Sequence, residues 1–551
     1  MNISFKVLIV VFLIFFVSIT FATIINIPDD YPTIQQGINA TVDSDTILVA
    51  DGIYAGNLNK NLTWNGIEKH IIVKSENGFE NCVIDCESDG RAFNFNQTSQ
   101  DTTDIIEGFT IMNGLVYFYE HNGGAIYCHS VSPKVQNNKL FDNVASDGAG
   151  GGIYIKFGSP IVRDNVIISN NAECGGGIYC SSSSAIIENN LIDGNAAAVL
   201  IWLDTSKGGG LYISGGSPLV KDNIIQNNIA FNDDIEGGAM GGGIYIFGSE
   251  ALIKNNLIIE NLVVIFGGYG AGSGIANQSY LSDTLHCVIE CNTIANNLGS
   301  GLFSLNATIM NNIIYANSNS GISYYPQSNN GIICNNNVYG NEPDFNNCPP
   351  GIGDTSWGFN INGTACDSCF NISEVPLFVS NQDEDFFLSQ LEAGQSEQSP
   401  CVDAGSGVPV DYGLENYTTR TDSIADIAIV DIGYHYPNGI VITNIENVEF
   451  QPKLYQLFNY PNPFKTSGAG RSPATTISFQ LSENGEVNLS IYNIKGQKIK
   501  TIVNEKLEQG LHQIIWDGKN DNNQYVASGV YFYKLKVNNK NIAIKKYLLL
   551  K

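Results

Sequence analysis

The sequence predicts an all-β protein in which a long solenoid of stacked coils precedes a small antiparallel sandwich. Three observations support this: a glycine–tyrosine motif recurs along the chain, an asparagine-rich segment follows each copy at a fixed distance, and a different alternating pattern begins near residue 457. The composition agrees, because 57 of the 551 residues are glycine, 43% are hydrophobic and only 15% are charged. This balance is typical of a turn-rich β protein with a substantial core.

Each repeat begins with a glycine run, an aliphatic residue and a tyrosine. Copies of GGGIY, GGGLY or GGAIY occupy 123–127, 150–154, 175–179, 208–212 and 241–245. An asparagine-rich segment follows, of which RDNVIISN (163–170) is an example. The step from the tyrosine to the inner asparagine is always 11 and from there to the last asparagine always 5, whereas the gap before the next glycine run varies from 4 to 12 residues. One corner of each repeat therefore accepts insertions.

Alternating apolar residues between tight turns, without an amphipathic run of helical length, predict a parallel β-solenoid. One coil cannot bury its own apolar face, but coils stacked about 4.8 Å apart can. A turn asparagine in every coil would then stack into a ladder of side-chain amides. The glycines are expected to form a tight corner just after the variable gap. They do not fit a phosphate loop, because such a loop precedes a helix and usually occurs once in a domain.

These coils resemble the right-handed parallel β-helix of the pectate-lyase-like superfamily, and the segment 27–54 resembles the start of many bacterial proteins of that group. We expect the β-helix to span 23–375, with one short amphipathic helix from Pro32 to Val42 covering its open apolar end. Residues 376–440 resemble the closing segment of secreted proteins of this kind, and we expect closing coils and a C-terminal cap there. Residues 441–456 are expected to be a linker.

Residues 457–551 predict a small antiparallel sandwich, because Val487, Leu489 and Ile491 alternate and Lys495-Gly496 marks a turn. The motifs YPNPF, IYNIKGQKIKTI and WDGKNDNNQYVASGVYFYKL resemble the Ig-like domain of flagellar hook-capping proteins, in the form that serves as a C-terminal sorting domain for type IX secretion. The resemblance implies that outer-membrane secretion machinery is a partner, and that the protein is secreted or displayed on the surface of a Gram-negative bacterium.

The N-terminus agrees with export. An apolar run from Val7 to Val17 precedes Thr20 and Ala22, which fit the small positions of a signal-peptidase site, so residues 1–22 are expected to be a cleaved signal peptide. A membrane anchor is the alternative, and it needs roughly 20 apolar residues. No later segment predicts a transmembrane span. The formal charge of −27 disfavours nucleic acid as a partner.

Twelve cysteines in an exported chain are compatible with disulfides, whose pairing stays open. The alternative is a zinc site at Cys366 and Cys369 with Cys348 and Cys401, but no second zinc-ribbon spacing or histidine ligand accompanies them. Asp517–Asn523 resembles a calcium loop without its late glutamate. We expect no resident cofactor or metal, with calcium as the alternative.

No catalytic residue can be assigned. The polygalacturonase signatures and the tryptophan-containing motif of pectate lyases are absent, and Asp233-Asp234 is followed by IEGG where the family has a histidine motif. Arg163 occupies a repeat position held by lysine or glutamate in several other coils, which favours a surface turn residue. His121 and His129, near Glu120, are a weaker alternative for a base. The resemblance therefore predicts the fold without carrying over any chemistry.

The insertions offer the best candidate for a ligand-binding surface, because loops inserted at one corner of a solenoid stack on one face. The long insertions are 196–207, 229–240 and 262–271. An aromatic residue beside acidic ones is typical of a sugar-binding surface, whereas the alternative is that apolar parts pack over the coil and the acids are solvated. The candidate ligand-binding residues are Trp202, Asp204, Asp233, Asp234, Glu236 and Tyr269.

Together these features predict a surface module that binds polysaccharide or cell-surface glycan, or acts in adhesion, without catalysis. The alternative is a carbohydrate-active enzyme, a polysaccharide lyase or glycoside hydrolase, that acts from the insertion face.

Overall fold

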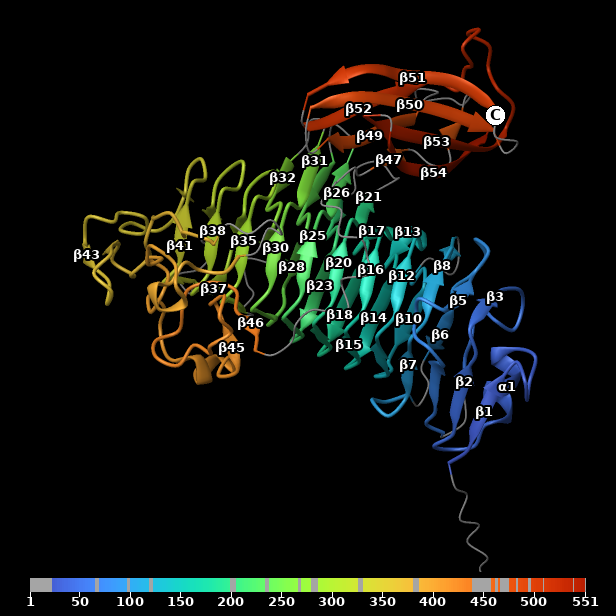
Figure 1. Cartoon of the computed structure of the whole chain (residues 1–551), viewed down its shortest axis with the longest axis horizontal. Coiled ribbons are helices and arrows are strands. Elements are labelled where there is room, and N and C mark those ends of the chain that lie inside the picture. The colour runs from blue at the N-terminus through green and yellow to red at the C-terminus, as the bar shows by residue number, and fades with distance from the viewer. Residues whose placement is uncertain are drawn as a thin grey trace, which may run out of the picture.

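The computed structural model comprises a solenoid, a closing segment and a sandwich (Figure 1). The described residues are 22–64, 69–96, 100–117, 122–198, 205–232, 237–265, 269–278, 286–325, 331–379, 386–438, 457–460, 464–465, 475–481, 484–493, 497–508, 510–538 and 540–550. Strands make up nearly all of the regular structure, which confirms the all-β prediction. Within the described residues no helix is long and apolar enough to cross a membrane. The predicted linker and nearly all of the predicted signal peptide lie outside these residues.

Three parallel sheets run along the solenoid, and each coil adds one strand to each of them. Sheet A follows the order β1 (Ile24–Ile27), β2 (Thr46–Val49), β4 (Ile72–Ser75), β7 (Ile105–Glu107), β11 (Lys134–Gln136), β15 (Ile161–Arg163), β19 (Ile186–Glu188), β24 (Leu219–Lys221), β29 (Leu252–Lys254), β34 (Cys287–Glu290), β37 (Ala307–Met310) and β40 (Ile332–Cys334). Sheet B follows β3 (Gly52–Tyr54), β5 (Cys82–Asp85), β8 (Thr110–Met112), β12 (Lys139–Phe141), β16 (Val166–Ile168), β20 (Leu191–Asp193), β25 (Ile224–Gln226), β30 (Leu257–Ile259), β35 (Thr293–Ala295), β38 (Ile313–Tyr315) and β41 (Asn337–Tyr339). Sheet C follows β6 (Phe93–Asn96), β10 (Ile126–His129), β14 (Ile153–Gly158), β18 (Ile178–Ser183), β23 (Leu211–Gly216), β28 (Ile244–Phe247), β33 (Ile275–Gln278), β36 (Leu302–Ser304), β39 (Ile322–Tyr324) and β42 (Phe345–Asn346).

The core consists of columns of apolar side chains that repeat from coil to coil. In sheet A, Val135, Val162 and Ile187 are register partners and all are fully buried. A buried aliphatic side chain of this size stabilises the fold by about 1.5–3 kcal/mol. Each coil obtains this burial only from its neighbours, so the solenoid is stabilised by stacking rather than within single coils.

The N-terminal end of the solenoid is covered by α1 (Ile34–Ala40), as the sequence predicts, although the helix is shorter than Pro32–Val42. Thr33 is its N-cap, and its side chain accepts a hydrogen bond from the Gln36 amide. Ile34 and Ile38 are fully buried. At the C-terminal end of α1 the buried Lys69 ammonium donates to the carbonyl oxygens of Ile38 (2.7 Å) and Thr41 (3.2 Å). These bonds satisfy carbonyl groups where the helix ends.

Two asparagine ladders, where one was expected, run along the solenoid. The first lies at the A–B corner, where the chain turns from sheet A to sheet B, and the second lies where sheet B ends. In both, the backbone N–H and side-chain Nδ2 of one asparagine donate to the Oδ1 of its counterpart in the next coil, as Asn165 does to Asn190 (both 3.0 Å). The first ladder comprises Asn138, Asn165, Asn190, Asn223, Asn256, Asn292, Asn312, Asn336 and Asn371. The second comprises Asn143, Asn170, Asn195, Asn228, Asn261, Asn297, Asn317 and Asn341.

Both ladders end on a carboxylate. Asn371 donates from its backbone N–H and from Nδ2 to the two side-chain oxygens of Asp367, both at 2.9 Å. Asn341 donates in the same way to Oδ1 of Asp344, at 2.8 and 3.0 Å. The fixed interval of five residues in the sequence therefore marks two stacked turns rather than one.

The glycine runs form the corner that leads into sheet C, as predicted. Gly150 has a φ of +70°, in the left-handed region that favours glycine. The next residue, Gly151, has no room for a side chain, because a Cβ would lie 2.5 Å from the carbonyl oxygens of both Asn171 and Gly176. The glycine run therefore allows the backbones of neighbouring coils to pack closely at this corner.

Residues 386–438, called the closing segment, fold back along the outside of the A–B corner. His435 exchanges two backbone hydrogen bonds with the Asn255 side chain (2.7 and 2.9 Å), and Ser406 does so with the Asn311 side chain (2.9 and 3.2 Å). Further along, the Tyr417 hydroxyl donates to Asp222 (3.1 Å). The short elements here and just before are β43 (Gly358–Phe359), β44 (Ala365–Cys366), η2 (Leu391–Ala393), η3 (Pro409–Tyr412), β45 (Tyr417–Thr418) and β46 (Tyr436–Pro437). The described part adds no strand to sheets A, B or C.

The C-terminal part forms two sheets around its own apolar core, as predicted for a small sandwich. One sheet comprises β47 (Leu457–Tyr460), β49 (Thr475–Leu481) and β52 (Gly510–Trp516), all antiparallel. The other comprises β48 (Phe464–Lys465), β54 (Lys540–Leu550), β53 (Gly529–Val537), β50 (Gly485–Asn493) and β51 (Lys498–Leu507). Trp516 is fully buried and donates from Nε1 to the Lys519 carbonyl (2.8 Å). The Asp517 carboxylate forms ion pairs with Lys500 and Lys519 (3.5 and 2.9 Å).

Candidate ligand-binding face

The insertions leave the solenoid as strands and return as strands, and together they form sheet D. The first strands of this sheet are β9 (Leu115–Val116), β13 (Val144–Ala149) and β17 (Asn171–Cys174). Beyond them, three outgoing arms pair with each other and three return arms pair with each other. The outgoing arms are β21 (Ala196–Ala198), β26 (Ile229–Asn232) and β31 (Leu262–Ile265), and the return arms are β22 (Thr205–Lys207), β27 (Gly238–Met240) and β32 (Tyr269–Ala271).

The arms stack in exact coil order, so the predicted gathering of the insertions on one face is correct for their described parts. Ala196, Ile229 and Leu262 are register partners on the outgoing side, and Thr205, Gly238 and Tyr269 on the return side. Of the six predicted site residues, only Tyr269 is described. The other five, Trp202, Asp204, Asp233, Asp234 and Glu236, lie outside the described residues, in the parts of the sequence between an outgoing and a return arm.

The described parts of the arms are packed and largely uncharged. Ile229, Phe231 and Leu262 form one buried apolar cluster. The Ser206 hydroxyl donates to the Phe231 carbonyl (2.5 Å), and Asn232 Nδ2 donates to the Gly238 carbonyl (2.9 Å), which ties the outgoing to the return arms. Lys207 is the one charged residue among the described arm residues, none of which is acidic. The described parts of the arms are therefore held together mainly by apolar packing.

Tyr269 is held across the return arms with its ring exposed. Its side chain crosses the neighbouring strand at Gly238, where a Cβ would lie 2.8 Å from the ring atom Cζ. Its hydroxyl lies 3.0 Å from Oγ1 of Thr205, two coils away. The residue nevertheless remains 55% exposed. Gly238 thus provides a seat for the ring and Thr205 fixes its tip, so the tyrosine presents a preorganised aromatic surface to solvent.

The tyrosines of the repeat motif form a column on the outside of sheet C. The rings of Tyr127, Tyr154, Tyr179, Tyr212 and Tyr245 stack with centroid distances of 5.1, 5.0, 4.7 and 5.3 Å. Near its end, Met240 of a return arm packs on Tyr245, and the Lys207 ammonium lies 5.8 Å from the Tyr245 ring centroid. Tyr154 and Tyr245 are buried (6% and 2% exposed), whereas the other three tyrosines of the column are partly exposed. The return arms therefore contact the column at Tyr245, through Met240 and Lys207.

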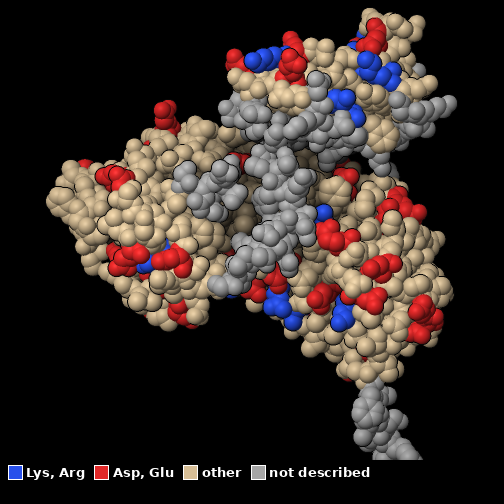
Figure 2. Space-filling view, in the orientation of Figure 1, with Lys and Arg blue, Asp and Glu red and all other residues tan. Residues whose placement is uncertain are grey.

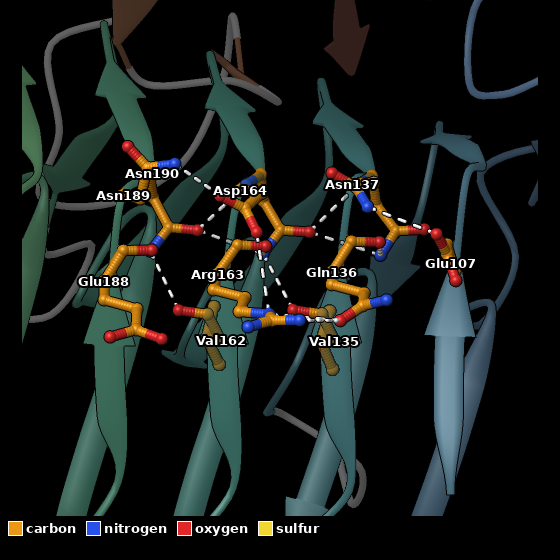
Figure 3. A network of polar contacts seen from close by, with 12 residues as sticks. Glu107, Val135, Gln136, Asn137, Val162, Arg163, Asp164, Glu188, Asn189 and Asn190 are labelled. Atoms are coloured by element: carbon orange, nitrogen blue, oxygen red, sulfur yellow. Dashed lines mark hydrogen bonds and ion pairs between the residues drawn. The ribbon is translucent and has the colours of Figure 1, made fainter. Parts of the chain in front are cut away.

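Arg163 belongs to a row of polar side chains on the outside of sheet A, shown in Figure 3. Its Nε and Nη2 atoms donate to Oε1 of Gln136 (3.1 and 3.0 Å), and Nε lies 3.5 Å from a carboxylate oxygen of Asp164. These contacts agree with the predicted surface position, but Arg163 is the last residue of strand β15 and does not lie in a turn as predicted. His129 also has a packing role, because its ring stacks on Tyr127 and meets the edge of Phe157. Glu120 and His121 lie outside the described residues.

Two side-chain clusters among the described residues have the donor types that could hold a metal ion, and neither contains a cysteine. The first comprises His70, Asp101 and Asp104. Asp104 is fully buried and already accepts four hydrogen bonds, from Trp64 Nε1, the Ile71 and Asp101 backbone N–H groups and His70 Nδ1. The Asp104 hydrogen bond raises the pKa of His70. This cluster joins neighbouring coils and leaves few free carboxylate lone pairs for a metal.

The second cluster, in the closing segment, comprises Asp403, Asp426 and Asp431 beside the buried His435. Asp431 is 3% exposed and accepts hydrogen bonds from the Thr419 hydroxyl, Gln390 Nε2 (3.2 Å) and the Asp403 N–H (2.7 Å). Asp426 accepts from the Asp431 N–H (2.9 Å) and lies 3.3 Å from His435 Nε2. Burial, and then the nearby Asp426 charge, raise the pKa of Asp431 to about 7.

This shift predicts a pH-dependent closing segment. A carboxyl group whose folded-state pKa exceeds its unfolded value of 3.8 contributes stability that is present below 3.8 and is lost as the pH rises through about 7. We expect the closing segment to loosen progressively between about pH 4 and 7, with a slope of at most about 1.4 kcal/mol per pH unit, and to change little above that range. Hydrogen exchange of 399–437 measures this. Asp431→Asn should flatten the profile and Glu415→Gln, an exposed change in the same segment, should not; a flat wild-type profile would contradict the prediction.

The comparisons with known families agree with this geometry. The family described as right handed beta helix region matches residues 95–256 and 205–366, on the coils themselves. The solenoid is a right-handed parallel β-helix. The FlgD Ig-like domain family matches residues 466–541, within the sandwich. No curated protein matches the chain.

Solved structures similar to this chain include three of different kinds. PorZ, a surface component of the type IX secretion system of Porphyromonas gingivalis, shows 15% identity and a TM-score of 0.13, with 25% of this chain and 16% of PorZ covered. The mannuronan C-5 epimerase AlgE6 A-module of Azotobacter vinelandii shows 12% identity and a TM-score of 0.34, with 62% and 94% covered. The PL6 family polysaccharide lyase Pedsa3628 of Pseudopedobacter saltans shows 13% identity and a TM-score of 0.28, with 57% and 84% covered.

Proposed function

We propose that this chain is an exported surface protein whose β-helix binds a neutral polysaccharide through the insertion face, without catalysis. The observation that supports this most directly is the exposed Tyr269 ring, seated on Gly238 and tied to Thr205. A rigid aromatic ring with one open face suits the apolar face of a sugar ring, and the buried Thr205 hydroxyl that contacts the Tyr269 hydroxyl holds the ring in place.

The charge of the molecule favours a neutral glycan over an acidic one. The formal net charge is −27, and Figure 2 shows acidic side chains scattered between broad neutral areas on the face in view. A polyuronate would be repelled by such a surface unless cations neutralised it. The one charged residue among the described arm residues, Lys207, lies against the Tyr245 ring rather than free on the surface. Binding should therefore depend little on ionic strength.

Substitutions at the tyrosine seat test this proposal. Tyr269→Ala should weaken binding about tenfold, or about 1.4 kcal/mol, because an exposed aromatic anchor is lost. Gly238→Ala should weaken it similarly while keeping the tyrosine, since the added Cβ displaces the ring. Affinity gel electrophoresis with xyloglucan, galactomannan and mixed-linkage β-glucan measures binding, with alginate as the acidic comparison.

Tyr325→Ala is the matched control, because Tyr325 is 41% exposed on the same solenoid outside the arms. It should leave binding unchanged. If none of the neutral polysaccharides retards the wild-type protein, or if both seat variants are retarded like the wild type, the proposal fails.

The alternative function, a lyase or glycoside hydrolase acting at the same face, would depend on the tip residues. Both reactions need acidic or basic groups at the bond that breaks, and the described parts of the arms carry no carboxylate. Asp204, Asp233, Asp234 and Glu236 would have to supply them. New reducing ends or unsaturated uronates after incubation with the same polysaccharides, abolished by Asp233→Asn or Asp234→Asn, would favour this alternative.

The proposed route of export depends on the sandwich, which has its own core and matches the FlgD Ig-like family. We propose that it is a C-terminal sorting domain read by outer-membrane secretion machinery. Deleting 457–551 should leave the β-helix folded, because the two cores are separate, but retained in the periplasm. Protease accessibility on intact cells measures display, and circular dichroism of the truncated protein controls for folding. Normal surface display of the truncated protein would contradict the proposal.

A further inference from the structure

One row of outward side chains, called the outer row, lies immediately before the first asparagine ladder. Its members precede the ladder asparagines by two residues, so their positions follow the coil register. They are Gln136, Arg163, Glu188, Lys221, Lys254, Glu290, Met310, Cys334 and Cys369.

Neighbours in the outer row pair with each other along the solenoid axis. Arg163 donates to Gln136, as Figure 3 shows, Lys221 lies 3.1 Å from Glu188, and Lys254 lies 3.9 Å from Glu290. The spacing between coils therefore brings consecutive side chains of this row into direct contact. The last two members of the row are both cysteines.

The register at the end of the solenoid places Cys334 and Cys369 side by side. Asn336 and Asn371 are consecutive members of the first ladder, and Nδ2 of Asn336 donates to Oδ1 of Asn371 (2.9 Å). Asn337 and Ile372 form a parallel β-bridge. The Asn335 N–H donates to the Cys369 carbonyl (3.0 Å). Parallel neighbours at about 4.8 Å lie within the range of about 4.4–6.8 Å between Cα atoms that a disulfide spans. The two thiols are within hydrogen-bonding reach of each other, and both residues are half-buried.

We propose that Cys334 and Cys369 form a disulfide once the protein is in an oxidising compartment. The cellular part of this inference rests on the proposed export. One of the two thiolates attacks a sulfur of an external disulfide, giving a mixed disulfide and releasing one external thiol. The second cysteine attacks the mixed disulfide at the protein sulfur and releases the other external thiol. Two protons leave the cysteines, and two electrons pass to the external disulfide, which is reduced.

The bond closes the chain from 334 to 369, which joins the last strand of sheet A to the segment that carries Asn371, the final member of the first ladder. A solenoid opens most easily at its ends, because a terminal coil contacts only one neighbour. The disulfide therefore protects the end at which the closing segment begins. In the reduced form, which the structure describes, burial and the neighbouring Cys369 thiol raise the pKa of Cys334 to about 12.

Other cysteines provide matched comparisons. Cys128 and Cys180 face the core of sheet C, and Ile155 of the intervening coil lies between them in register. Two coil steps, about 9.6 Å, exceed the span of a disulfide. Cys366, although close to Cys369 in sequence, is buried in the apolar cluster that contains Cys401.

Peptide mapping of the full chain tests the proposal. The reduced protein is equilibrated with oxidised and reduced glutathione, alkylated, digested without reduction and analysed by mass spectrometry. We expect a linked peptide pair containing Cys334 and Cys369, and ten thiols instead of twelve by titration in denaturant. Cys334→Ser and Cys369→Ser should each abolish the linked pair, whereas Cys128→Ser should keep it. Oxidation should slow cleavage by protease between 334 and 399 at least severalfold.

Recovery of both cysteines in alkylated form, or of either one linked to a different cysteine, would overturn the proposal. The glutathione buffer supplies the oxidising conditions whatever compartment the protein occupies, so a failure of the export experiments leaves this test intact.

Discussion

Replacing Asn223 by alanine is expected to lower the free energy of unfolding of the β-helix by about 3–5 kcal/mol. Asn223 is fully buried in the first ladder. Its Oδ1 accepts from the backbone N–H and from Nδ2 of Asn190, and its own Nδ2 donates to the Ile187 and Lys221 carbonyls and to Asn256. Alanine leaves these groups without partners in a site that water does not reach, and each unsatisfied buried group costs about 1–3 kcal/mol.

Urea unfolding followed by circular dichroism measures this loss as a lower transition midpoint. Asn189→Gly is the control, because Asn189 directly precedes Asn190, the ladder partner of Asn223, has a φ of +53° and an exposed side chain, and donates to Asp164 outside the ladder. Glycine tolerates that backbone, so we expect a change of less than about 1 kcal/mol. Equal losses for the two variants would show that the ladder contributes no more than an exposed turn.

The second large effect is expected from Gly151→Ala, which should destabilise the β-helix by more than about 3 kcal/mol. The added Cβ would lie 2.5 Å from two carbonyl oxygens and 2.6 Å from the Asn171 backbone nitrogen. None of these atoms belongs to a side chain that could rotate away, so the backbones of two coils have to separate. Because the return arms lead into the same corner in later coils, as β22 leads into Gly208, Gly209→Ala should also weaken binding at the insertion face.

Thermal unfolding of Gly151→Ala and Gly194→Ala distinguishes this packing effect from the conformational preference of glycine. Gly194 has a φ of +60° but open surroundings, with the Ser169 hydroxyl oxygen 4.0 Å from the added Cβ. Alanine there should cost only about 1 kcal/mol, the penalty for a left-handed conformation. Similar losses at both positions would refute the packing explanation.

Much of the β-helix could be predicted because its repeats preserve register. The interval of 11 residues between Tyr154 and Asn165, kept between Tyr179 and Asn190, is realised as a stacked tyrosine pair and a stacked asparagine pair. The second ladder was implicit in the interval of five residues, but the pattern alone did not indicate that both asparagines face inward. The helix is shorter than predicted, because Thr41 adopts an extended backbone and its N–H bonds to the Ile38 carbonyl.

The site was less predictable, because it depends on contacts between coils. The gathering of the insertions could be inferred from their common corner, but Ala196–Ala198 and Thr205–Lys207 show no alternation that predicts strands. They become strands by pairing with the arms of the next coil. The seat of Tyr269 on Gly238 likewise follows from register rather than from a motif. The closing segment binds Asn255 through His435, 180 positions later in the chain. A local sequence pattern cannot predict a contact between residues so far apart.

The carboxylates at the ends of the two ladders give the β-helix a direction. In the bonds between ladder asparagines the donor always lies in the coil nearer the N-terminus and the acceptor in the next coil, so these bonds run in one direction along each ladder. An asparagine can pass such a bond on, because it has both an acceptor and donors, whereas an ionised aspartate can only accept. Asp344 and Asp367 place negative charge where the last N–H groups point, as an acidic N-cap does for a helix. The two aspartates therefore end the ladders. A further coil could continue a ladder only if a residue with a hydrogen-bond donor, such as asparagine, replaced the carboxylate.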